Sequence, residues 1–392
     1  VPNVPPLRFP EFTGEWEKST LGGIADIVGG GTPETDRKEY WNGEIIWYTP
    51  SEIGKNKYSS DSERHITQEG LDNSSAKLLP SGTILLSTRA TIGESSIALN
   101  KCTTNQGFQS LIAQRGIYHE FLYYLIATKK HELVRRACGS TFLEISANEV
   151  RKVPVLVPSF KEQYKLSTFL GLIDQRIETQ NKIIEDLKTL KSAISARLFK
   201  SNIFDKRIKL SSLGTLKNGY AFQSSTYTID GQYSILTIAN VSGDRYTTNE
   251  CNHITEIPND IQQYQILKDN DILISLTGNV GRVSLNTGEN NLLNQRVGLF
   301  QISDESLREY IYQILATPYF EKSMIAKGQG AAQMNISKSD VEEYEIPYTD
   351  DKSLIDKVSY TLYLLDQRII CAQRLASAYS TQKQYLLQQM FI

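Results

Sequence analysis

The sequence is poor in the residues that metal sites and disulfide frameworks need. Its 392 residues include only four Cys and four His, and no two of the cysteines form a CxxC pair. The HExxH pattern of zinc hydrolases is also missing, so we predict no metal site. Free thiols in a reducing cytosol are the natural interpretation of such isolated cysteines.

An excess of one charge and long apolar runs are lacking as well. The net charge is -2 at pH 7, so any surface for DNA or RNA has to be a local patch. No apolar run approaches the ~20 residues that a membrane span requires, and the Pro-rich N-terminal segment has no signal-peptide core. We therefore expect a cytoplasmic protein that makes no contact with a membrane.

Known catalytic motifs are not found either. The phosphate-loop pattern GxxxxGK[ST] and the nucleophile elbow GxSxG do not occur. The Asn/Asp-Pro-Pro-aromatic motif of amino-methyltransferases is likewise missing. No catalytic residue is therefore predicted in this chain.

A long stretch with helical periodicity is the most informative feature that is present. Residues 160–199 contain one Gly and no Pro, and apolar residues recur in them with a spacing of three or four. This pattern predicts one helix of roughly 60 Å, packed against another helix. The apolar seam consists of Leu170, Ile173, Ile177, Ile184, Leu187, Ile194 and Leu198, and Gln180 and Lys191 interrupt it.

A second seam occupies residues 361–391. The tetrapeptide that begins at Asp174 recurs unchanged at Asp366, an offset of 192 residues, and the interrupting Lys191 aligns with Lys383. A pair of spacer helices, parallel or antiparallel, explains this length better than two unrelated surface helices do. The second seam consists of Leu362, Leu365, Ile369, Ala372, Ala376, Tyr379, Leu386 and Met390.

The duplication extends beyond the helices. The segment LPSGTILLSTRATIG (79–93) aligns with LKDNDILISLTGNVG (267–281), and the Asn-Gln pair at 105–106 aligns with the pair at 294–295. Each half of the chain is thus one globular module followed by one long helix. The predicted boundaries are 1–158 and 201–348 for the modules, and 159–200 and 349–392 for the helices.

Each module is predicted to be α+β. Short segments rich in Ile, Val, Tyr and Thr predict strands, and one amphipathic helix is expected near 117–137 and another near 304–326. Strands and helices do not alternate regularly, so a doubly wound parallel sheet is not expected. The predicted strands include Ile45–Tyr48, Thr83–Ser87, Ile235–Ile238 and Asp271–Ser275.

The loops of both modules are rich in side chains that can recognise bases. Arg can bind guanine with two hydrogen bonds, Asn and Gln can bind adenine, and a Thr methyl group can contact the thymine methyl group. Ordinary polar turns are the alternative interpretation. The candidate DNA-binding residues are Thr88, Arg89, Thr91, Asn105, Gln106, Ser140, Thr141, Thr277, Asn279, Arg282, Asn294, Gln295, Arg296, Gln329 and Gln333.

The order module, helix, module, helix resembles the specificity (S) subunit of type I restriction-modification enzymes. The resemblance covers essentially the whole chain, and RFPEF…W (8–16), the segment 79–93 and the duplicated DQRI seams carry it. It implies an α+β fold with two target recognition domains, each of which recognises one half of a split DNA site. It also implies that the two helices pack as an antiparallel coiled-coil spacer.

The same resemblance implies partners. Double-stranded DNA, two methyltransferase (modification) subunits and restriction subunits are expected, with S-adenosylmethionine, ATP and magnesium used by those subunits and no cofactor in this non-catalytic chain. The loops of the two modules differ, so we predict an asymmetric bipartite site. A protein-interaction scaffold without direct DNA readout and a divergent DNA-modifying enzyme are the alternatives. The helix-pairing residues are predicted to be Ile173, Ile177, Ile184, Leu187, Leu365, Ile369, Ala376 and Leu386.

Overall fold

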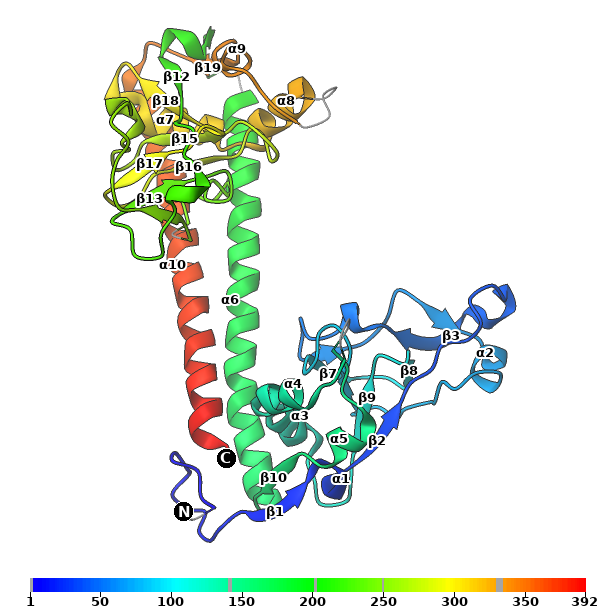
Figure 1. The fold of residues 1–392 in the computed structure, drawn as a ribbon. Coiled ribbons are helices and arrows are strands. Elements are labelled where there is room, and N and C mark those ends of the chain that lie inside the picture. The colour runs from blue at the N-terminus through cyan, green and yellow to red at the C-terminus, as the bar shows by residue number, and fades with distance from the viewer. Residues whose placement is uncertain (1–2, 140–142, 201–202, 249, 329–333) are drawn as a thin grey trace. The chain divides into compact units, whose positions relative to one another are not determined.

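The chain divides into two compact units. The computed structural model describes residues 3–139, 143–200, 203–248, 250–328 and 334–392 (Figure 1). Unit 1 consists of Val1–Thr179 together with Ala376–Ile392, and unit 2 consists of Gln180–Leu375. None of the helices in these described ranges is both long and apolar enough to cross a membrane.

The module of unit 1 is built on two small sheets. One has five strands in the order β2-β9-β6-β7-β4, and the other has three in the order β5-β3-β8. Strand β1 pairs antiparallel with β10, so the chain enters and leaves the module at one place. The strands are β1 (Glu17–Thr20), β2 (Ala25–Gly29), β3 (Trp41–Tyr48), β4 (Tyr58–Ser59), β5 (His65–Ile66), β6 (Ile84–Leu86), β7 (Ser95–Ala98), β8 (Cys102–Thr104), β9 (Gln109–Ala113) and β10 (Pro154–Val157).

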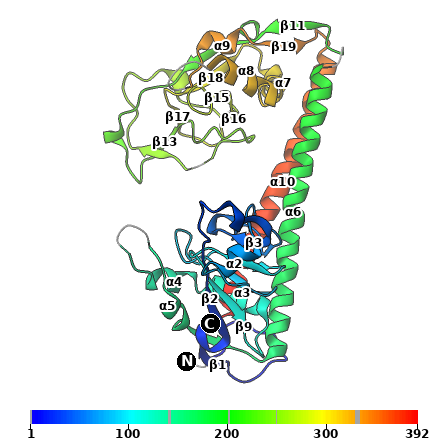
Figure 2. The same ribbon diagram turned by 90° about the vertical axis from the view of Figure 1, so that its right-hand side faces the viewer.

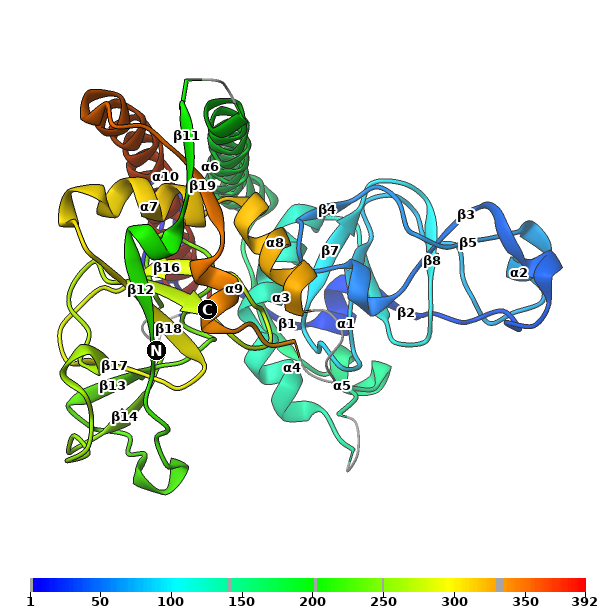
Figure 3. The same cartoon turned by 90° about the horizontal axis from the view of Figure 1, so that it is seen from above.

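The helices of this module are short. They are α1 (Leu21–Ile24), α2 (Gln68–Asp72), α3 (His119–Thr128), α4 (Lys130–Arg136) and α5 (Ala147–Arg151), with 3-10 turns η1 (Lys38–Tyr40) and η2 (Pro50–Glu52). The single helix expected near 117–137 is wrong, because Lys129 leaves the helical conformation and separates α3 from α4. Leu133 of α4 lies in the same core as the buried residues of α3. Figure 3 shows α2 and the three-stranded sheet at the end of the module away from α3.

Unit 2 repeats this topology apart from β4, which has no equivalent strand in the described part of that unit. Its larger sheet has the order β12-β18-β15-β16, its smaller sheet has the order β14-β13-β17, and β11 pairs antiparallel with β19 as β1 does with β10. The duplication seen in the sequence therefore extends to strand order. The strands are β11 (Lys206–Lys209), β12 (Gly214–Asn218), β13 (Tyr233–Leu236), β14 (Asn252–Ile254), β15 (Ile272–Ser275), β16 (Val283–Leu285), β17 (Asn291–Leu293), β18 (Val297–Ile302) and β19 (Glu345–Tyr348).

The helix expected near 304–326 is also divided. Its parts are α7 (Arg308–Leu315), which packs next to β16 (Figure 2), and α8 (Pro318–Gly328). Pro318 lacks an N–H group and has a φ angle suited to a first helical turn, so it opens a new helix instead of continuing α7. The remaining short elements are α9 (Lys338–Glu342), η3 (Leu210–Ser212), η4 (Ser224–Thr226), η5 (Gln263–Gln265) and η6 (Glu305–Leu307).

The two long helices are present as the seams predict. Helix α6 spans Phe160–Lys200 and helix α10 spans Lys352–Met390, and each contributes residues to both units. In unit 1 the buried Leu170 of α6 and Leu386 of α10 share one core with α3. In unit 2 the buried Leu362 of α10 and the partly buried Ile194 of α6 share another core with α7. Each module core is therefore completed by both long helices.

The N-terminal segment is fixed to α6 by a buried carboxylate. Glu162 accepts hydrogen bonds from Arg8 Nε at 2.8 Å and Arg8 Nη2 at 2.7 Å, and from the Trp16 indole N–H at 3.2 Å. Its side chain is only 2% exposed. These contacts give a structural role to the Arg and Trp of the motif at residues 8–16.

Candidate nucleic-acid interface

Three loop segments lie side by side in the first module. The N–H of Thr88 donates to the carbonyl oxygen of Gly107 at 2.9 Å, and the N–H of Ile145 donates to the carbonyl oxygen of Thr88 at 3.1 Å. These bonds connect the segment after β6, the turn between β8 and β9, and the segment before α5. We call this group of segments loop cluster 1 (residues 87–91, 105–107 and 143–145).

Two of the predicted contact residues in loop cluster 1 support its backbone. Thr88 is fully buried, and its hydroxyl donates to the Gly107 carbonyl oxygen at 3.1 Å. The side-chain oxygen of Asn105, which is half-buried, accepts the Gly107 N–H at 2.8 Å. Both side chains use their polar atoms within the loops.

The other predicted residues of loop cluster 1 are exposed. Arg89 is half exposed and forms an ion pair with Glu144 at 2.6 Å. Thr91 shares a 3.0 Å hydrogen bond with the Ser87 hydroxyl, and Gln106 accepts a hydrogen bond from Thr32. Guanidinium, hydroxyl and carboxamide groups thus lie on neighbouring loops.

The second module contains an equivalent arrangement. The Leu276 N–H donates to the Arg296 carbonyl oxygen at 3.0 Å, and the Ile336 N–H donates to the Leu276 carbonyl oxygen at 2.9 Å. The Thr277 hydroxyl bonds to Asn335 at 3.0 Å, where Arg89 bonds to Glu144 in the first module. We call this group of segments loop cluster 2 (residues 275–282, 294–296 and 334–336).

The predicted residues of loop cluster 2 divide in the same way. Asn294 is 8% exposed, and its side-chain oxygen accepts the Arg296 N–H at 3.3 Å. The side chains of Asn279, Gln295 and Arg296 are exposed. Arg282 is half-buried, with its Nε 3.5 Å from a carboxylate oxygen of Glu321.

The remaining four predicted contact residues fall outside the described part of the chain. They are Ser140 and Thr141 in the first module, and Gln329 and Gln333 in the second.

Each of the two loop clusters has a residue with a positive φ angle at the same aligned position. Ala90 has a φ of 63°, and its counterpart Gly278 has a φ of 74°. A left-handed conformation is unfavourable for a residue with a Cβ, so Ala90 stores strain at the tip of loop cluster 1. The two loops therefore share a local shape although their exposed side chains differ.

Two glycines that sequence reasoning did not select allow the loops to approach the sheet. A Cβ on Gly30 would lie 2.1 Å from the Asn105 carbonyl oxygen, and a Cβ on Gly219 would lie 2.0 Å from the Asn294 carbonyl oxygen. Only Gly fits such an approach. The signal was available, because both glycines hold the same place in the aligned repeats.

The predicted helix-pairing residues are buried to different extents. Ile173, Ile369, Ala376 and Leu386 are buried, and Ile177, Ile184, Leu187 and Leu365 are half-buried. Lys191 and Lys383, which only interrupt the seam in the sequence, form ion pairs of 2.6 Å with Asp366 and Asp174. Sequence reasoning missed this role, although both Lys and both Asp recur in the repeat.

Groups suited to metal binding do not gather in the described ranges of the chain. No set of three or more His, Cys, Asp or Glu side chains there has a geometry that holds a metal ion. All four cysteines are free, and burial raises the pKa of the Cys102 thiol to about 12.

Comparison with known proteins identifies the family. A family model described as the type I restriction modification DNA specificity domain matches residues 13–189 and 206–371. The chain belongs to this family, and both of its modules contain a match.

Two relatives in this family are similar to part of the chain. The type I restriction enzyme MjaIX specificity subunit of Methanocaldococcus jannaschii is 39% identical over 195 residues, 49% of this chain and 44% of that protein. The EcoR124I/EcoR124II specificity subunit of Escherichia coli is 31% identical over 175 residues, 43% of each chain. The chain thus matches less than half the length of either relative.

Solved structures support the fold over nearly the whole chain. The S subunit of a type I restriction-modification system from M. genitalium superposes with a TM-score of 0.59 at 17% identity and covers 99% of both chains. A structure concerned with complex assembly and conformational transition of the type I R-M system gives a TM-score of 0.57 at 16% identity. At such identities the likeness supports the fold alone.

Proposed function

We propose that this chain is the DNA-recognition subunit of a type I restriction-modification complex. Each module recognises one half of an asymmetric bipartite site, and the chain itself carries out no catalysis. Family membership supports the class of protein, and the relatives in that family are named specificity subunits. The modules and helices take the boundaries 1–158, 159–200, 201–348 and 349–392.

One observation carries this proposal: the same three-loop scaffold occurs twice and presents different side chains. Loop cluster 1 exposes Arg89, Thr91 and Gln106, whereas loop cluster 2 exposes Asn279, Gln295 and Arg296. These groups provide donors and acceptors for base edges in a major groove. A shared scaffold with different exposed groups suits two modules that recognise different half-sequences.

The buried members of the two clusters take a positioning role in this proposal. Thr88, Asn105 and Asn294 hold the backbone from which the exposed groups project. Arg282 is assigned to a phosphate contact, because a half-exposed guanidinium at the edge of a loop can bind a phosphate without displacing buried structure. Thr277 connects two loop segments through Asn335.

The long helices serve as an antiparallel spacer in this proposal. In unit 1 Asp174 of α6 pairs with Lys383 of α10, and in unit 2 Lys191 of α6 pairs with Asp366 of α10. Moving forward along α6 therefore corresponds to moving backward along α10. Two ion pairs with this pattern support opposite chain directions and a coiled-coil contact.

The partners follow from the family and remain part of the proposal. Two methyltransferase subunits bind the duplicated chain equivalently, because a repeat gives pseudo-twofold symmetry. Restriction subunits join them, and those partners use S-adenosylmethionine, ATP and magnesium. With a net charge of -2 the chain has little general attraction for DNA, so phosphate contacts made by the partners contribute much of the affinity.

The decisive experiment maps methylated adenines in DNA modified by the assembled complex. We expect two different half-sequences separated by a fixed spacer. Replacing residues 20–155 with the corresponding module of a relative should change one half-sequence and leave the other unchanged. An unchanged pair of half-sequences would overturn the role of the first module and favour a scaffold without DNA readout.

A single substitution gives a sharper test of loop cluster 2. Arg296→Ala should relax base preference at one position of one half-site by about 10- to 100-fold, the effect of one lost bidentate contact. Arg207→Ala removes an exposed arginine on β11 and serves as the control. Equal methylation patterns for the two variants would remove Arg296 from the recognition surface. Tight binding of S-adenosylmethionine or metal-dependent DNA cleavage by the chain alone would favour a DNA-modifying enzyme instead.

A further inference from the structure

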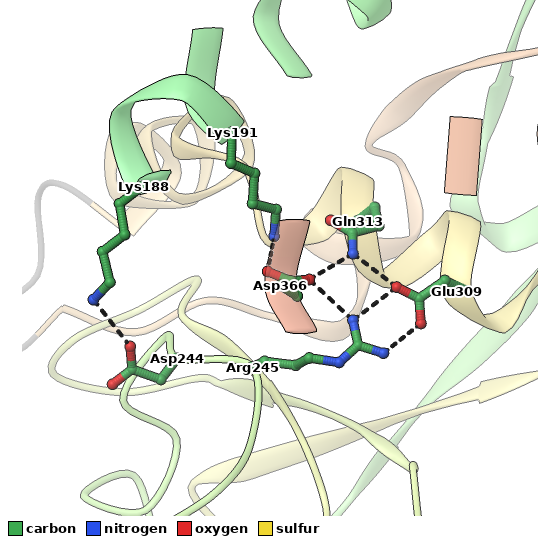
Figure 4. Close-up of polar contacts among 7 residues, drawn as sticks. All are labelled: Lys188, Lys191, Asp244, Arg245, Glu309, Gln313 and Asp366. Carbon is green, nitrogen blue, oxygen red and sulfur yellow. Dashed lines mark hydrogen bonds and ion pairs between the residues drawn. The ribbon is translucent and has the colours of Figure 1, made fainter. Parts of the chain in front are cut away.

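A buried polar cluster connects the second module to both long helices. Arg245, on the loop between β13 and β14, donates from Nη1 and Nη2 to the two carboxylate oxygens of Glu309 on α7 at 2.7 and 2.5 Å (Figure 4). Nη1 also donates to Asp366 of α10 at 3.0 Å. The side chains of Arg245 and Asp366 are 6% and 7% exposed. We call this group junction 2.

Asp366 lies at the centre of junction 2. Its Oδ1 accepts a hydrogen bond from Lys191 of α6 at 2.6 Å. Its Oδ2, which Arg245 binds, also accepts a hydrogen bond from Gln313 of α7 at 2.7 Å. One carboxylate therefore binds donors from a module loop, a module helix and the other long helix. The Arg245 guanidinium lies 4.9 Å from the ring centre of Tyr312, which further limits its movement.

The first module has a corresponding cluster in unit 1. Lys57 donates to Glu120 of α3 at 2.9 Å and to the Tyr124 hydroxyl at 3.1 Å. That hydroxyl donates to Asp174 of α6 at 2.5 Å, and Lys383 of α10 binds the other oxygen of Asp174 at 2.6 Å. We call this group junction 1.

The electrostatics of junction 1 favour the charged state of Glu120. Burial opposes ionisation of this carboxyl group, but hydrogen bonds from Tyr58 and Lys57 outweigh burial and hold the pKa of Glu120 below its usual range. Burial together with the charge of Asp174 raises the pKa of Tyr124, so its hydroxyl remains a donor.

The two junctions are related by the internal repeat. Lys57 and Arg245 are 188 residues apart, and both Glu120–Glu309 and Tyr124–Gln313 are 189 apart. Asp174–Asp366 and Lys191–Lys383 are both 192 apart. The long helices exchange roles between the junctions, since α6 supplies the Asp of junction 1 and the Lys of junction 2.

The ion pairs of Lys191 and Lys383 are not the arrangement expected to stabilise the helix seam most. Both lysines occupy positions of an apolar seam, where a hydrophobic side chain of similar volume is often as stabilising as a buried ion pair or more so. Charged groups at such positions can instead specify one register, because only one alignment pairs them. A slip of one helical turn moves a helix by about 5.4 Å and would separate both pairs.

We propose that junctions 1 and 2 are positioning devices that clamp each module to both long helices and fix the register of α6 against α10, so that the complex accepts one distance between its half-sites. This inference rests on the proposed function. Asp174 and Asp366 are the central positioning residues, and Lys191 and Lys383 are the register residues. None of the four contacts a base in this proposal.

The test uses a variant that keeps the seam packed. Lys191→Met combined with Lys383→Met removes both register pairs and places apolar side chains of similar length in the seam. The assembled complex is given DNA in which the spacer between the mapped half-sequences is native, or one or two base pairs longer or shorter. Methylation of the altered spacers, relative to the native one, should rise about tenfold, which corresponds to about 1.4 kcal/mol.

Two further variants distinguish a loss of helix register from a general loss of stability. Lys188→Met removes a lysine one turn away, whose ion pair with Asp244 is long at 3.4 Å and exposed, and it should leave spacer preference unchanged. Lys191→Arg with Lys383→Arg retains the charges and should restore the single spacer. The Met double variant should unfold at the same urea concentration as the parent chain or a higher one.

Three outcomes decide the matter. A Met double variant that is stable and still restricted to the native spacer would overturn the positioning role. Loss of stability together with loss of all methylation would also count against it, since the junctions would then act only in folding. If the parent complex methylates no bipartite site, the proposed function itself fails, and this result is distinct from the first two.

Discussion

The contact between Arg8 and Glu162 allows a quantitative prediction. Glu162→Ala removes a carboxylate whose side chain is 2% exposed and leaves Arg8, whose side chain is 13% exposed, without its ion-pair partner. Removing one member of a buried ion pair costs about 3–5 kcal/mol. Because Arg8 retains some access to water and a bond to the Gly14 carbonyl oxygen, we expect about 3 kcal/mol.

Urea unfolding followed by tryptophan fluorescence measures this effect in the right part of the chain. All three tryptophans, Trp16, Trp41 and Trp47, belong to unit 1, where Glu162 also lies. With a slope of about 2 kcal/mol per M, a loss of about 3 kcal/mol lowers the unfolding midpoint by about 1.5 M.

The matched control joins the same two segments at the surface. Glu11→Gln removes an ion pair with Lys165 of α6 in which both side chains are 45% exposed, and such pairs contribute about 0–1 kcal/mol. Arg8→Ala added to Glu162→Ala should cost little more than Glu162→Ala alone, because the two side chains act as one unit. A midpoint shift for Glu162→Ala no larger than that for Glu11→Gln would refute the reasoning.

Three further predictions concern unit 1 and use the same assay. Ile177→Asp places a charge in the helix seam and should lower the midpoint and weaken assembly of the complex, and normal assembly would count against the seam. Glu120→Gln should flatten the acid side of the stability curve. The pKa of Glu120 is about 4.5 in the unfolded chain and lower in the folded chain, so its carboxylate adds stability above about pH 4.5, and this stability is lost as the pH falls through the folded value. If the variant and the parent chain lost stability equally at acid pH, the lowered pKa of Glu120 would be contradicted. Gly30→Ala should destabilise by about 1–3 kcal/mol because its Cβ would meet the Asn105 carbonyl oxygen, whereas Gly171→Ala, with ordinary contacts in α6, should be neutral or stabilising by up to about 1 kcal/mol. Equal shifts for these two variants would contradict the packing argument.

Periodicity and internal repetition are sufficient to predict the two long helices and the repeated order of module and helix. The seams at Ile173 and Ile369 identify α6 and α10, because heptad spacing is a local property of the sequence. The break at Lys129 was not predictable in this way. Apolar residues continue on both sides of it, and the core that Leu133 joins is built from segments far apart in the chain, which a local pattern does not contain.

The sequence identifies loops rich in polar side chains, but it does not tell which of these side chains are exposed. Polarity marks Thr88 and Arg89 equally, but one is buried against Gly107 and the other is exposed. That difference depends on backbone bonds between segments far apart in the chain, which composition does not contain. The seam pattern marks Lys191 and Lys383 only as interruptions, because the sequence of one helix shows no partner for a charge on it.

Unit 1 contains residues from both ends of the chain, and this has a consequence for folding during synthesis. Its core includes Leu386, Met390 and Phe391, and the Phe391 ring stacks on Phe121 at 5.5 Å between ring centres. Ribosomes add about 5–20 residues per second, so roughly 200 residues emerge over some tens of seconds before these side chains arrive. During that interval the apolar side chains around Phe121 and Trp16 in the first module remain exposed to solvent. The nascent chain is therefore most exposed to chaperones and proteases at the module that is made first.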